Sequence, residues 1–120
     1  YAWITLLGLG INISGGSDCP VEPFDLLPNL ACAVTRTDPT MPGAKPWHPE
    51  QCLSVEEAVR AFTQGAAYAS FEEDERGTLS VGKVADFAVL SRDIFTINPN
   101  EIGSTKVEMT VVDGEIAWEK

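Results

Sequence analysis

The stretch from Ile11 to Pro20 constrains the fold most. Its first four positions alternate apolar and polar residues, which is typical of a short β-strand. Gly15 and Gly16 then end the alternation, and Pro20 prevents a regular ladder from continuing beyond Asp18. The pattern therefore predicts a strand whose C-terminal end carries one carboxylate, at the place where catalytic groups lie in barrels and open α/β sheets. A second interpretation stays open, in which Asp18 is an ordinary turn residue whose side chain accepts a backbone N–H.

Charge and cysteine content narrow the classes of function. The net charge of −10 comes from 18 acidic and 8 basic side chains, so we expect no nucleic-acid partner and no anionic membrane surface. No apolar run approaches the ~18 residues of a membrane span. The three cysteines, Cys19, Cys32 and Cys52, are odd in number and lack C-x-x-C spacing. They predict free thiols in a reducing compartment, and cytoplasmic is the default localisation.

Helical spacing dominates residues 1–76. Apolar positions predict the end of a helix over residues 1–9, and a second helix that Asp25 can cap and that runs to about Arg36. Ser54 and Glu57 form a capping-box pattern at the start of a third helix. We expect this helix to direct inward a row of mostly small or apolar residues: Val55, Ala58, Val59, Phe62, Ala66 and Ala69.

Two segments interrupt or end these helices. Residues 37–52 contain four prolines (Pro39, Pro42, Pro46 and Pro49), and a loop of this length usually lies over a site or a subunit contact. Gly65 should weaken the third helix mildly. The acidic run of residues 72–75 lacks the alternating ligand spacing of a calcium loop, so it predicts a solvated helix end.

From Gly77 onward the period changes from helical to alternating. Residues 86–90 predict a largely buried strand, and residues 106–112 a half-buried one. Asp113-Gly114 is typical of a type I′ hairpin turn, after which residues 115–118 return. The tail is thus expected to form a small antiparallel sheet appended to an α/β piece. Three such strands need a partner layer for stability.

Four motifs, in this order, carry a resemblance to a known family. They are G-G-S-D-C-P-V-E-P-F from Gly15, A-V-T-R from Ala33, L-S-V-E-E-A-V-R-A-F-T from Leu53 and G-T-L-S-V-G-K-V-A-D-F-A-V-L-S from Gly77. Together they resemble the C-terminal part of metal-dependent amidohydrolases, and most closely the amidohydrolase 3 subgroup (the YtcJ-like or AepA-like hydrolases). The match covers nearly the whole chain.

The resemblance implies an α/β fold that is the C-terminal fragment of a (β/α)8 TIM barrel. Residues 1–76 would hold strand eight and the following helices, and residues 77–120 the C-terminal strands of a flanking β-sandwich. It also implies a hydrolase acting on C–N bonds other than peptide bonds. Asp18 corresponds to the aspartate after strand eight, which in the family binds the metal or lies beside it. There it takes a proton from the metal-bound water and passes it to the leaving nitrogen.

The resemblance further implies a divalent metal, zinc by expectation, whose other ligands come from barrel strands outside this chain. His48 lies at a position that is not a ligand in the family, and Cys19 is expected to be a pocket wall. His48, Cys19 and Glu22 are the conceivable further metal ligands beside Asp18. One or two of them would be too few for a stable zinc site. We therefore expect no metal tightly bound by this chain alone. Asp86 is expected to have a structural role in the sandwich.

As an isolated chain of 120 residues the protein should be inactive, since a barrel needs about 200 residues or more. Its expected partners are a small-molecule substrate and either further copies of itself or the rest of the barrel. An alternative is a non-catalytic structural or interaction domain derived from the same fold. A third is an enzyme of the same superfamily that acts on another bond, such as an ester. The sequence leaves the substrate and its binding residues open.

Overall fold

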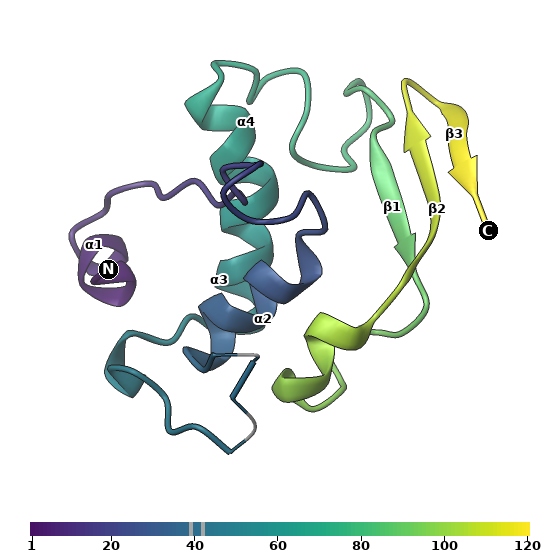
Figure 1. Cartoon of the computed structure of the whole chain (residues 1–120). Helices are drawn as coiled ribbons and strands as arrows, with labels where there is room; N and C mark the ends of the chain where they lie inside the picture. Colours follow the sequence, from purple (N-terminus) through teal and green to yellow (C-terminus); the bar gives the residue numbers. More distant parts are fainter. Residues whose placement is uncertain (39, 42) are drawn as a thin grey trace.

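A computed structural model describes residues 1–38, 40–41 and 43–120, so that Pro39 and Pro42 of the proline-rich loop lie outside the described residues. Helices occupy one side of the molecule and a three-stranded sheet the other, with the chain ends on opposite sides (Figure 1). The helices are α1 (Trp3–Gly8), α2 (Leu27–Thr35), α3 (Val55–Arg60) and α4 (Ala66–Ala69). The strands are β1 (Phe87–Leu90), β2 (Val107–Val112) and β3 (Glu115–Glu119).

The starts of α2 and α3 follow from local sequence. The Asp25 carboxylate accepts the N–H of Leu27, the first residue of α2, at 3.1 Å, although the N-cap position is Leu26 and not Asp25 as predicted. Ahead of α3, the N–H of Glu57 donates to Ser54 Oγ at 3.1 Å, and the N–H of Ser54 donates to Glu57 Oε2 at 2.8 Å. The predicted capping box is therefore confirmed. It satisfies backbone N–H groups that the first helical turn leaves without partners.

α3 and α4 form one continuous rod in Figure 1, joined by a π turn over Ala61–Gly65. A π turn takes one residue more than an α turn, so the side chains beyond it are rotated around the axis. Ala61 and Ala67 are buried, whereas Ala69 is exposed. The expectation that Ala69 faces inward was wrong for this reason.

The predicted strand over residues 11–14 is not formed within the described part of the chain. The segment is extended but has no ladder partner there, and Ile11 is 47% exposed. A strand is defined by hydrogen bonds to a neighbouring strand. Here the N–H of Gly15 instead donates to the carbonyl of Ala61 in the π turn, at 2.9 Å.

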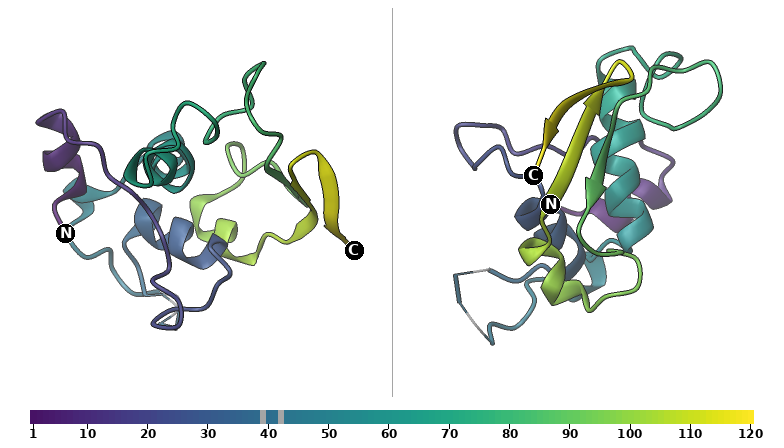
Figure 2. Two further views of the ribbon diagram at one scale, coloured as in Figure 1. Left: turned by 90° about the horizontal axis from the view of Figure 1, so that it is seen from above. Right: turned by 90° about the vertical axis from the view of Figure 1, so that its right-hand side faces the viewer.

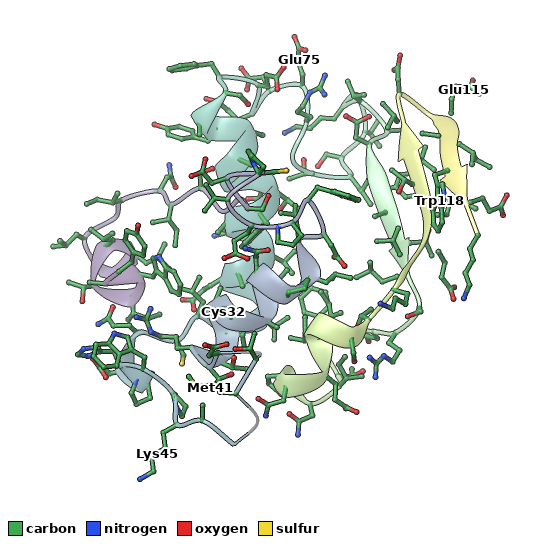
Figure 3. All side chains as sticks on the ribbon, in the orientation of Figure 1. Cys32, Met41, Lys45, Glu75, Glu115 and Trp118 are labelled. Atoms are coloured by element: carbon green, nitrogen blue, oxygen red, sulfur yellow. The ribbon has the colours of Figure 1, made fainter. Side chains whose placement is uncertain are left out.

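The sheet is antiparallel in the order β1-β2-β3, as the sequence predicted. Asp113 and Gly114 have φ angles of 52° and 79°, which fits the predicted type I′ turn between β2 and β3. β1 is not largely buried, contrary to expectation, because no second layer of described residues covers it; Phe87 is 37% exposed. Figure 3 labels Trp118 on β3, the edge strand at the far end of the sheet from the helices.

The core lies between α2, α3 and a 3₁₀ helix, η3 (Pro99–Ser104). Its buried members are Leu30, Ala33, Leu53, Ala58, Ile94 and Ile102. The views in Figure 2 show η3, in light green, beside α2 and before β2. No described helix has the length and the apolar character that a bilayer crossing requires.

Asp86 connects the sheet to the helical side. Its Oδ1 accepts the N–H of Asp113 at 2.8 Å, and its Oδ2 lies 3.0 Å from Nη1 of Arg76. One carboxylate thereby joins the hairpin turn to the segment after α4. This arrangement agrees with the structural role expected for Asp86.

Candidate functional site

Asp18 lies on an exposed turn that is held by hydrogen bonds between main-chain groups. The N–H of Val21 donates to the Asp18 carbonyl at 2.9 Å, and the N–H of Glu22 to the Ser17 carbonyl at 3.3 Å. Asp18 has φ 52°, in the left-handed region that aspartate tolerates better than most residues. Among the described residues its side chain accepts no hydrogen bond, so the turn does not use the carboxylate. Among the described residues the carboxylate thus does not accept the backbone N–H that the turn interpretation predicted.

Two glycines let the segment before Asp18 pass against the helix. A Cβ atom on Gly65 would lie 2.1 Å from the carbonyl oxygen of Ile13, and one on Gly15 would lie 2.4 Å from the Phe62 ring. Real Cβ atoms essentially never come within 3.0 Å of a non-bonded heavy atom. We call this close approach, of Ile13 to Gly65 and of Gly15 to Phe62, the glycine crossing. The sequence interpretation missed it, although a glycine within a strong helical pattern is a recognised signal for close packing.

The other candidate ligands do not assemble around Asp18. The described residues contain no group of three or more His, Cys, Asp or Glu side chains that could hold a metal ion. Cys19 is exposed beside Asp18 on the turn. His48 is committed to its own loop, where Nδ1 lies 2.8 Å from Glu50 Oε1 and the ring packs edge-on against Trp47.

The resolved pKa shifts have local causes away from the Asp18 turn. The Thr40 hydroxyl and N–H both donate to the Asp38 carboxylate and lower the pKa of that group. The pKa of Glu50 is lowered by its own backbone N–H and then by His48. Burial raises the pKa of the Cys32 thiol. Described Cys19, Cys32 and Cys52 are all free thiols, as predicted.

Comparison with known proteins identifies the family. The model of the amidohydrolase family matches residues 1–117. The chain belongs to the amidohydrolase family. Over 120 residues, all of this chain, it is 38% identical to the putative amidohydrolase YtcJ of Bacillus subtilis, covering 23% of that protein. It is 33% identical over 116 residues, 97% of the chain, to the N-substituted formamide deformylase of Arthrobacter pascens, covering 21% of that enzyme.

A solved amidohydrolase structure agrees with this assignment. The crystal structure of an amidohydrolase from Thermotoga maritima superposes with a TM-score of 0.66 and 26% identity, over 98% of this chain and 25% of that one. This amidohydrolase chain thus spans about a quarter or less of the length of the relatives it matches. Its helices and small antiparallel sheet form an α/β piece.

Proposed function

We propose that the chain is the C-terminal part of a metal-dependent hydrolase that cleaves C–N bonds other than peptide bonds. Family membership and the name of the formamide deformylase support this class of reaction. Residues 1–76 would end a TIM-barrel domain with strand eight and its following helices. Residues 77–120 would add strands to a flanking β-sandwich. The segment before Asp18 has no ladder partner among the described residues, which suits a barrel strand whose neighbours lie elsewhere in the protein.

Asp18 is the residue to which we assign chemistry. The observation that carries the assignment is its carboxylate, exposed on a turn whose hydrogen bonds are all main-chain. Such a carboxylate can accept a proton from the water that attacks the substrate carbon. The same proton then passes to the nitrogen as the C–N bond breaks, and Asp18 returns to its ionised state. General acid–base catalysis of this kind contributes about 100- to 10,000-fold in rate.

The residues of this chain do not by themselves fit the metal that the family implies. Zinc sites use three or four protein ligands, and Asp18 supplies one. When bound, a divalent metal lowers the pKa of its water toward about 7. We propose that the whole enzyme holds zinc through Asp18 and ligands from other barrel strands. The isolated chain would then bind no metal tightly and would be inactive.

An apolar cavity favours association with further protein. It measures about 930 Å³ and lies between the α3–α4 rod, at Val59 and Phe62, and the sheet, at Phe87 and Ala88. We propose that the rest of the barrel or further copies of the chain cover such surfaces, while the substrate is a small molecule. A non-catalytic interaction domain would also have an apolar surface open to a partner. Such an interaction domain is therefore the second candidate function.

The test of the proposal is Asp18→Asn in the whole protein, assayed with an N-substituted formamide by release of the amine. We expect turnover to fall at least ~100-fold, because the amide does not take up the proton. Asp113→Asn is the matched control, since Asp113 is also an exposed aspartate with φ 52°. It should keep normal turnover. Normal turnover of Asp18→Asn would contradict the role of Asp18.

Elemental analysis after dialysis separates the two candidate functions. We expect one or two divalent ions per chain of the whole protein and no stoichiometric ion on the 120-residue chain. A tightly bound zinc on the 120-residue chain would show that Cys19, Glu22 or His48 completes a site. A whole protein free of metal and of hydrolytic activity would favour the interaction domain.

A further inference from the structure

We propose that the glycine crossing sets the position of the Asp18 carboxylate, so that Gly15 and Gly65 are positioning residues for the reaction. The inference rests on the proposed function of Asp18. It concerns two residues without side chains, whose neighbours are Phe62 and the backbone of Ile13 and Ser14. Their effect would pass through the backbone of the segment that leads to Asp18.

Gly65 lies where the helix has no space for a side chain. This residue has φ −63° and ψ −40°, which suit alanine as well as glycine, and alanine in a helix is favoured by about 1 kcal/mol. A methyl group there would nevertheless lie 2.1 Å from Ile13 O and 3.1 Å from Ile13 C. Both are backbone atoms, which cannot rotate away as a side chain would. The segment and the helix would have to separate by about 1 Å to reach the 3.0 Å limit of real contacts.

A hydrogen bond ties Gly15 to the π turn. The carbonyl of Ala61, where the π turn begins, accepts the N–H of Gly15 at 2.9 Å. Single π turns within α-helices occur frequently at functional sites. Gly15 itself meets the Phe62 ring, from the same turn. The helix therefore holds the segment at Ile13 and at Gly15, by two contacts and one hydrogen bond.

Gly15 lies close to Asp18 along the chain. Only Gly16 and Ser17 separate Gly15 from Asp18, and the Ser17 carbonyl is already bonded to the N–H of Glu22. A displacement at Gly15 would therefore reach the turn through only two residues, one of which is held by that hydrogen bond. A misplacement of about 1 Å can cost about 100-fold in rate.

The experiment compares Gly65→Ala with Gly16→Ala in the whole protein. Gly16 lies beside the crossing, and a Cβ there would meet nothing within 4 Å. We expect Gly65→Ala to lower kcat about 100-fold on an N-substituted formamide with KM changed less than about threefold. Hydrogen exchange of the Gly15 amide should accelerate at least about tenfold. Gly16→Ala should leave both measurements near wild type.

A rescue tests the crossing from its other side. Gly15→Ala should lower kcat and speed exchange, and Phe62→Leu in the same protein should restore at least half of kcat, because the ring is removed from the space that the new methyl needs. Additive losses in the double variant would overturn the inference, as would unchanged exchange at residue 15 in Gly65→Ala. The inference would also be overturned if Asp18→Asn abolished turnover while Gly65→Ala kept a normal kcat. Normal turnover of Asp18→Asn would instead overturn the proposed function, and the exchange data would still test the crossing.

Discussion

The helical side of the molecule and the sheet are held together by different means. On the helical side, backbone approaches backbone closely enough at Gly65 to exclude a methyl group, and Ile102 of η3 is fully buried against α2. In the sheet, order comes from strand pairing and a type I′ turn, while Ile116 and Trp118 stay 58% and 49% exposed. The helical side is therefore specified by shape, and the sheet by its hydrogen-bond register. Substitutions that remove the same atoms should have unequal effects on the two sides.

The largest expected difference is between two isoleucines. Ile102→Ala should lower the free energy of unfolding by about 2–5 kcal/mol, because it empties a fully buried site. Ile116→Ala deletes the same atoms from an exposed position and should cost less than about 0.5 kcal/mol. Urea denaturation of both variants measures the difference. Equal losses would mean that Ile116 is covered in solution, and the contrast between the two sides would fail.

A smaller effect should come from the start of α3. Ser54→Ala removes the acceptor of the Glu57 N–H and should cost about 1 kcal/mol. Ser80→Ala is the control, since Ser80 is exposed before the sheet and, among the described residues, its hydroxyl donates only to that of Thr78. Its free energy of unfolding should remain within about 0.5 kcal/mol of wild type. A control as costly as Ser54→Ala would show that the connecting turn is as tightly specified as the helix.

The smallest effect concerns the ion pair that joins the two sides. Arg76 and Asp86 lie 3.0 Å apart, with side chains 39% and 28% exposed. A double-mutant cycle with alanine at both positions should give a coupling of about 0.5 kcal/mol, and less in high salt. The cycle is needed because Asp86→Ala also removes the acceptor of the Asp113 N–H. A coupling well above about 1 kcal/mol would show that the sheet and the helical side unfold as one tightly linked unit.

Features encoded by neighbouring residues could be predicted from the sequence. The capping box needs only Ser54 and Glu57, and the type I′ turn only Asp113 and Gly114, so the rules of local geometry suffice. The three helices and the antiparallel sheet followed from hydrophobic period in the same way, whereas the strand predicted over residues 11–14 did not form. The turn at Asp18 was the alternative that the sequence left open, whereas the predicted strand before it needs a pairing partner that residues 11–14 do not themselves supply.

Features that depend on distant residues could not be predicted. Gly65 was interpreted as a weak helix position, since nothing near it in sequence indicates that Ile13 lies against it. The exposure of Ala69 depends on a π turn that no propensity rule places. Phe87 was expected to be buried because its strand is apolar, but burial depends on a covering layer and not on the strand itself.

The positive φ of Asp18 limits which residues evolution can place there. Asparagine and glycine enter this backbone region at little cost, whereas glutamate, which carries the same acid, does so poorly. If the turn alone were under selection, descendants of this chain would drift freely among aspartate, asparagine and glycine. If proton transfer is under selection too, aspartate alone meets both demands. A paralogue that has lost catalytic activity could then keep the fold with asparagine or glycine at this position. That single replacement would identify it as inactive.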